Sequence, residues 1–192
     1  FLVDMDLINA AVWCDGLRRE HLIAQAKRVT HLANPTSREQ LMAWLQESEE
    51  GLEVTDLTKK EVPKLLERAT TADVREMLGL RQELAKTSTT KYNAMVRAVC
   101  SDDRIRGLTQ FYGANRTGRW AGRLVQVQNL PQNKLPDIRE ARALVKNREL
   151  DMVEMLYGSV ADTLSQLIRT AFTSEDGSRL IVVDFSAIEA RV

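Results

Sequence analysis

Two carboxylates late in the sequence, Asp184 and Glu189, are placed where a metal-dependent reaction could use them. Four apolar residues at 180–183 follow the turn-forming sequence Asp-Gly-Ser at 176–178. A short apolar run after a turn is typical of a strand buried on both faces. Asp184 would end that strand, where a side chain can meet solvent or a cation, and Mg²⁺ prefers one or two carboxylates together with substrate phosphates. The stretch therefore predicts a strand that delivers an aspartate to a divalent cation.

The same stretch also fits a purely structural interpretation. Ser186 can cap a helix that begins directly after it, with Glu189 three residues later as its capping-box partner. Asp184 would then only end a core strand. Residue types and spacing alone leave both interpretations open.

A second group of residues suited to chemistry lies at 116–123, with the sequence RTGRWAGR. Glycines let the backbone approach a ligand closely, and arginines bind phosphates or read base edges with two hydrogen bonds. A tryptophan among arginines also suits stacking on bases. A tight basic turn in a surface hairpin is the alternative explanation for these residues.

Both stretches resemble motifs of the family A DNA polymerases. The sequence DFSAIEAR at 184–191 is similar to motif A, Asp-Tyr-Ser-Gln-Ile-Glu with an arginine shortly after; Phe185 and Ala187 are the departures. The Thr-Gly-Arg at 117–119 is followed nine residues later by the Gln-Asn-Leu-Pro at 128–131, as in that family. The intervening Trp-Ala-Gly-Arg resembles the phage branch.

The resemblance implies a template-directed DNA polymerase, phage- or prophage-encoded, that acts as a monomer in the cytoplasm of a bacterial host. It would join a primer 3′-hydroxyl to the α-phosphate of a deoxynucleoside triphosphate on primer–template DNA, with pyrophosphate leaving. Two Mg²⁺ ions would stabilise the attacking and leaving oxygens, held by the carboxylate of Asp184 and the carbonyl of Phe185. Glu189 would lie under the incoming sugar and exclude a 2′-hydroxyl.

The resemblance also implies a set of DNA contacts. Arg119 would reach the minor-groove edge of the primer-terminal pair and the sugar of the nucleotide. Gln128 and Asn129 would contact template and primer near the terminus. The remaining contacts would come from Lys86, Arg116, Thr117, Gly118 and Arg123.

Composition limits the class of protein. Hydrophobic residues make up 44% of the 192 residues and charged residues 28%, as in ordinary globular proteins. No apolar run approaches the roughly 20 residues that span a bilayer, and no signal-peptide pattern is present. Cys14 and Cys100 lack metal-type spacing and indicate a reducing compartment.

The net charge of zero hides a segregation along the chain. Residues 81–149 carry 14 Lys or Arg against 6 Asp or Glu, whereas acidic residues are in excess on both sides of this block. A basic block of this kind suggests contact with a polyanion. A solvated surface is the alternative explanation.

Hydrophobic periodicity and caps predict the elements that position these residues. We expect an α+β fold, which the resemblance divides into a helical thumb region at 1–103 and the start of a palm with a small antiparallel sheet at 104–192. The segments at 34–41 and 84–89 are similar to parts of the thumb. The expected helices are 4–28, 37–46, a short one capped by Thr58, 73–100 with a weak point at 87–90, 137–146 and 151–172, and the expected strands are 105–112, 124–131 and 180–183.

The sequence begins without methionine and ends at most one turn into a helix, so we expect it to be a piece of a longer polymerase. Fingers and a second palm carboxylate would lie beyond Val192. The piece alone would bind DNA without catalysis. A non-catalytic nucleic-acid-binding module or an inactive remnant is the alternative from another class. Glu189 argues against a single-subunit RNA polymerase, and the Thr-Gly-Arg and Gln-Asn pair argues against a reverse transcriptase.

Overall fold

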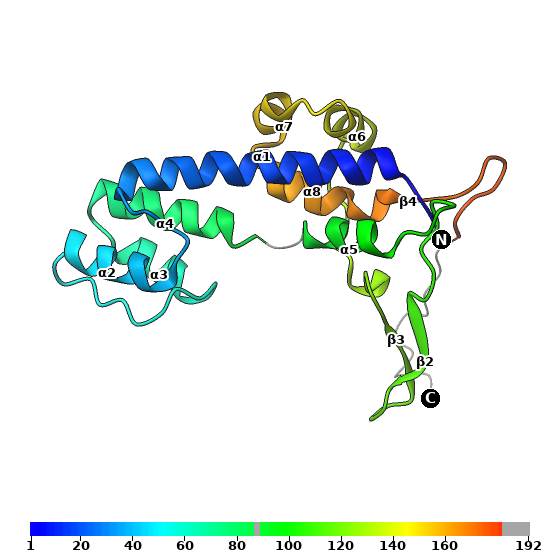
Figure 1. The fold of residues 1–192 in the computed structure, drawn as a ribbon, viewed down its shortest axis with the longest axis horizontal. Coiled ribbons are helices and arrows are strands. Elements are labelled where there is room, and N and C mark those ends of the chain that lie inside the picture. The colour runs from blue at the N-terminus through cyan, green and yellow to red at the C-terminus, as the bar shows by residue number, and fades with distance from the viewer. Residues whose placement is uncertain (87–88, 182–192) are drawn as a thin grey trace.

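One long helix, α1 (Met5–Thr30), is the axis of the fold in the computed structural model, which describes residues 1–86 and 89–181 (Figure 1). The side chain of Asp4 accepts a hydrogen bond from the Leu7 amide at 3.0 Å and so caps the first turn. The helix ends at His31, whose φ of 56° is left-handed and whose amide donates to the Lys27 carbonyl. The predicted first helix is therefore confirmed.

A small helical cluster packs on the C-terminal half of α1. It consists of α2 (Arg38–Ser48), α3 (Glu61–Arg68) and α4 (Ala72–Leu84), and Ala26 joins their buried residues from α1. Ser37 caps α2 as predicted, but the side chain of Gln40 accepts from the Asn34 amide instead of closing the capping box. The cap predicted for Thr58 is wrong, because its backbone carbonyl, not its hydroxyl, accepts from the first amides of α3.

A larger core forms around the N-terminal half of α1. It brings together α5 (Thr90–Ala98), α6 (Ile138–Lys146), α7 (Leu150–Tyr157), α8 (Val160–Leu167) and the 3-10 helix η2 (Ile168–Ala171). Tyr92 of α5 is fully buried, and its hydroxyl donates to the Leu164 carbonyl at 2.7 Å. This core draws on residues from both sides of position 103, and the predicted division there stays a prediction.

Two predicted long helices are divided in the structure. The run 73–100 separates into α4 and α5. Arg18 and Arg19 of α1 donate to the carbonyls of Glu83 and Leu84 at the end of α4 and so satisfy carbonyls that lack a partner within the helix. The run 151–172 breaks at Gly158, which has a φ of 75°. The prediction of one continuous helix over 151–172, whose apolar residues would share one face, is therefore wrong. The first part of this run leaves Met152, Met155 and Leu156 exposed.

The strands form two small antiparallel sheets. β1 (Leu2–Val3) pairs with β4 (Phe172–Thr173), and β2 (Thr109–Ala114) pairs with β3 (Arg119–Gly122) in a hairpin. Together with the helices α1–α8 they confirm the α+β class. No helix of the described residues is long and apolar enough to cross a membrane.

Two strand predictions are wrong in the described part. The segment 124–131 contains a 3-10 helix, η1 (Val127–Asn129), after Leu124 and Gln126, both of which have a φ of 55°. Of the strand predicted at 180–183, Leu180 and Ile181 are exposed and form no strand, and 182–183 lie outside the described residues.

Candidate nucleic-acid interface

The β2–β3 hairpin projects from the helical body and carries the predicted Thr-Gly-Arg motif (Figure 1). Arg116 and Thr117 are exposed in its connecting turn, where the amides of Thr117 and Gly118 both donate to the Ala114 carbonyl. Gly118 has a φ of 66°, and a Cβ at this position would lie 2.8 Å from the ring of Tyr112. Both observations favour glycine at position 118, so this residue of the motif fits the turn that the structure forms.

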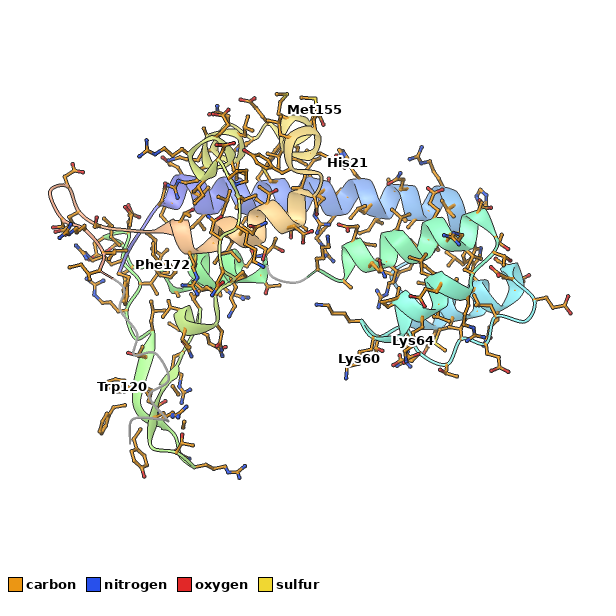
Figure 2. The ribbon with its side chains drawn as sticks, turned by 180° about the vertical axis from the view of Figure 1, so that it is seen from behind. His21, Lys60, Lys64, Trp120, Met155 and Phe172 are labelled. Carbon is orange, nitrogen blue, oxygen red and sulfur yellow. The ribbon has the colours of Figure 1, made fainter. Side chains whose placement is uncertain are left out.

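Three large aromatic side chains are exposed on the same hairpin. Phe111 is 69% exposed, Tyr112 58% and Trp120 64%. The rings of Phe111 and Trp120 meet edge to face across the two strands, with centroids 5.3 Å apart and planes at 69°. Figure 2 shows Trp120 projecting from the hairpin, away from the helices. The hairpin therefore presents apolar ring surface at a position remote from both cores.

The hairpin lies within a stretch that contains no acidic residue, 104–136. Its basic residues are Arg104, Arg106, Arg116, Arg119, Arg123 and Lys134. At the base of the hairpin, Arg104 pairs with Glu175, and Arg106 pairs with Asp102 at 2.6 Å. Within residues 1–86 and 89–181, neither Arg116 nor Arg123 forms an ion pair with a carboxylate. Arg116 in the turn and Arg123 directly after β3 therefore offer positive charge to a polyanion.

Gln128 and Asn129 lie in the loop that follows the hairpin and packs against it. A Cβ on Gly122 would lie 2.1 Å from the amide nitrogen of Gln128. The Gln128 side chain therefore fits here only because Gly122 has no side chain. The Asn129 side chain donates weakly to Gln126, at 3.4 Å. The structure thus brings the predicted Gln-Asn pair next to the strand that carries Trp120.

Two cations from helices hold this loop by its carbonyl groups. The ammonium of Lys91 in α5 donates to the Val125 carbonyl at 2.7 Å. The guanidinium of Arg169 in η2 donates to the Leu130 carbonyl at 2.8 Å and to the Pro131 carbonyl at 2.9 Å. Neither contact is predictable from the sequence, because an isolated basic residue on a helix gives no indication of its hydrogen-bond partner.

Replacing Arg169 with methionine is expected to loosen this loop. The substitution keeps much of the side-chain length but removes the charged donor, and the loss of these partly exposed hydrogen bonds should cost about 1 kcal/mol of unfolding free energy. We also expect the amide hydrogens of Asn129 and Leu130, which close the 3-10 turn, to exchange several-fold faster. Arg179→Met, at an exposed arginine outside this loop, is the matched control. Unchanged amide exchange in Arg169→Met would contradict the assigned role.

Lys86 lies apart from the hairpin and is held by acidic neighbours. Its ammonium contacts Glu83 at 2.8 Å, Asp162 at 2.9 Å and the Ser159 hydroxyl at 3.2 Å, joining the end of α4 to α8. Burial acts to lower the pKa of Lys86, but the hydrogen bonds with Glu83 and Asp162 outweigh it and raise the pKa. A DNA phosphate would have to compete with these carboxylates, and the phosphate contact expected of Lys86 stays a prediction.

The residues expected to carry the chemistry, Asp184, Phe185 and Glu189, lie outside the described residues. In the described part of the chain, no three His, Cys, Asp or Glu side chains are grouped so that they could hold a metal ion. The Mg²⁺ site stays a prediction that depends on Asp184 and Phe185. The described residues therefore contain a candidate surface for nucleic acid. The candidate reaction centre is predicted only from the sequence motif at 184–191.

Comparison with known proteins gives one informative relationship. Over 190 residues the chain is 53% identical to a protein of Bacillus phage SP02 named DNA polymerase. The aligned part is 99% of this chain and 29% of that polymerase, so the chain spans less than a third of the relative's length. No family model matches the sequence. No solved structure matches it either.

Proposed function

Taking the relationship to the phage polymerase as the premise, we propose that the chain is part of a DNA-directed DNA polymerase of family A. The observation that carries the polymerase role is the 53% identity to a protein named DNA polymerase, which extends over 99% of the chain. The assignment to family A is supported by the motif resemblance at 117–119, 128–131 and 184–191. The parent polymerase would act as a monomer in the bacterial cytoplasm.

In this proposal the reaction extends a primer with deoxynucleoside triphosphates. Bound Mg²⁺, held by Asp184 and the Phe185 carbonyl, would stabilise charge on the reacting phosphate. Glu189 would stand against the 2′ position of the incoming sugar and disfavour ribonucleotides. Arg119 would hold the primer-terminal pair at its minor-groove edge, where acceptor atoms face an arginine donor.

The described residues would contribute DNA binding and no complete reaction centre. Arg116 and Arg123 on the hairpin would neutralise phosphates, and the loop with Gln128 and Asn129 would follow the same strand. Lys60, directly before α3, and Lys64 of α3 are exposed on the side of the molecule toward which the hairpin extends (Figure 2). A duplex lying against this side could meet positive charge at both places.

The double substitution Arg116→Gln with Arg123→Gln is expected to weaken primer–template binding by roughly tenfold or more near 0.1 M salt. Each lost phosphate contact should also reduce the slope of log affinity against log salt by about 0.9, so the double variant should lose nearly 2. Fluorescence anisotropy of a labelled primer–template over a salt series measures both quantities.

The matched control for this experiment is Lys27→Gln with Arg28→Gln. It changes the net charge equally but lies at the far end of α1, where both residues are exposed. Equal losses in the two double variants would show that binding depends on net charge and would remove the hairpin from the proposed interface. A chain that binds no primer–template at low salt would contradict the DNA-binding part of the proposal.

A further inference from the structure

The exposure of Phe111 and Trp120 is not explained by the fold. Both rings are roughly two-thirds exposed although they lie on a two-stranded hairpin far from either core. Their edge-to-face contact supports strand pairing, but it covers only a small part of each ring. Tyr112 differs, because its ring lies over Gly118 and helps to form the turn. Of the three exposed aromatic side chains on the described hairpin, Phe111 and Trp120 are therefore the two whose exposure the fold does not explain.

The residues around Phe111 and Trp120 are of the kinds that bind a nucleic-acid strand. Successive side chains of a strand point to opposite faces, so Trp120 shares a face of β3 with Gly122, against which the Gln128 amide lies. That amide has both a donor and an acceptor for the edge of a base. Arg116 and Arg123 lie on the two sides of Trp120 in the sequence, within a stretch that lacks acidic residues. Aromatic ring surface for stacking and positive charge for the phosphates are the two components of sites that bind single strands.

We propose that Phe111 and Trp120 form a stacking platform for unpaired nucleobases, so that the hairpin holds single-stranded DNA. Inside a duplex the faces of a base are covered by its neighbours and only its edges reach the grooves. A ring can therefore stack fully only on a base that is unpaired, and such stacking tolerates any sequence. The platform rests on the proposed DNA-binding function and adds to it a site for an unpaired strand, next to the paired primer terminus that Arg119 would hold.

Trp120 fluorescence provides a direct test. Replacing Trp13 and Trp44 with phenylalanine leaves Trp120 as the single tryptophan of the chain. A 12-nucleotide oligo(dT) should then quench this fluorescence, and a blunt 12-base-pair duplex should quench it far less. Stacking on a base lies in the range of 1–3 kcal/mol, so Phe111→Ala and Trp120→Ala, each in the otherwise unchanged chain, should lower oligo(dT) affinity about tenfold or more. Their duplex affinity should change less than about twofold.

Two further variants make this test specific to the platform. Trp120→Tyr keeps an aromatic ring and should retain most of the oligo(dT) affinity that Trp120→Ala loses. A purely structural role of Trp120 would not predict this dependence on an aromatic ring. Trp13→Ala removes a 41% exposed indole from α1 and should have no effect on this affinity. Circular dichroism melting of every variant confirms that the fold is intact.

The possible results separate the platform from the proposed function. If Phe111→Ala and Trp120→Ala bind oligo(dT) like the unchanged chain while Arg116→Gln with Arg123→Gln does not, the platform is wrong and the DNA-binding proposal stands. If the unchanged chain binds neither oligo(dT) nor duplex, both proposals fail. Equal quenching by duplex and oligo(dT) would also overturn the platform.

Discussion

Asp184→Ala in the full-length polymerase is expected to slow primer extension by about a thousandfold or more, while affinity for primer–template DNA changes less than about threefold. The proposed role of the carboxylate is to hold Mg²⁺ at the reacting phosphate, where a metal ion supplies several kcal/mol of charge stabilisation. In the proposal, DNA binding depends on other residues, those of the hairpin and its loop. Single-turnover extension and anisotropy titration of the same preparation measure the two effects separately.

Asp176→Ala is the control for that experiment. Asp176 is an exposed carboxylate in the turn that precedes the motif, so its loss changes the net charge equally. We expect extension by this variant within about twofold of the unchanged enzyme. Extension by Asp184→Ala at a comparable rate would refute the assignment of Asp184 as a metal ligand, and a matching loss of DNA affinity would assign it to binding instead.

Asp4→Ala is expected to lower the unfolding free energy by about 2–3 kcal/mol, the largest effect on stability that we expect from a single charged residue. This carboxylate is 14% exposed and joins distant parts of the chain. It caps α1 through the Leu7 amide, and it pairs with Arg142 at 2.7 Å and Lys146 at 3.2 Å on α6. Loss of the cap costs about 1 kcal/mol, and the two cations of α6 lose their partner. Urea denaturation followed by circular dichroism measures the change.

Two variants divide this effect into its parts. Asp6→Ala removes a carboxylate of the same turn that is 87% exposed and lies 3.7 Å from the Lys146 ammonium. This substitution should lower the unfolding free energy by no more than about 0.5 kcal/mol. Asp4→Asn keeps a good N-cap but loses the charge, so it should cost about 1–2 kcal/mol. Equal stability of Asp4→Ala and Asp6→Ala would disprove the joining role of Asp4.

The same carboxylate predicts a dependence on pH. Burial acts to raise the pKa of Asp4, but the Leu7 hydrogen bond and the interactions with Lys146 and Arg142 outweigh it, so the pKa is lowered. A lowered pKa contributes stability that is fully present above the unfolded-state pKa, near 4, and is lost as pH falls through the folded-state pKa. The stability difference between the unchanged chain and Asp4→Asn should therefore be constant from about pH 7 to 5 and shrink below about pH 4. A difference that grows on acidification would contradict the assignment.

The candidate interface was predictable from sequence only in part. The cluster at 116–123 was recognised as a basic hairpin turn or a nucleic-acid contact because glycine and arginine have strong local preferences, and the structure places it in a hairpin. The Phe111–Trp120 contact and the fit of Gln128 against Gly122 were not foreseen. Both depend on strand register and on how the loop folds back, and a bulge between Gln110 and Ala114 alters that register.

The sequence by itself determined the elements whose cause is local. Helices α1, α2 and α6 were predicted within a few residues, because apolar periodicity and the caps at Asp4 and Ser37 act within one or two turns. Local signals were sufficient for these three helices. The motif resemblance also names Asp184, Phe185 and Glu189 as candidate reaction residues, and these stay predictions because they lie outside the described residues.

Only the tertiary structure decided where distant donors meet the backbone. Arg18 and Arg19 donate to the last carbonyls of α4 from another helix, and Lys91 and Arg169 hold the carbonyls of a segment that alternates like a strand in sequence. These donors are separated from their acceptors by 34 to 65 positions. The physical reason is that a buried backbone carbonyl accepts a hydrogen bond from whichever donor lies near it in the folded chain. The residues next to that carbonyl in the sequence do not predict which donor this is.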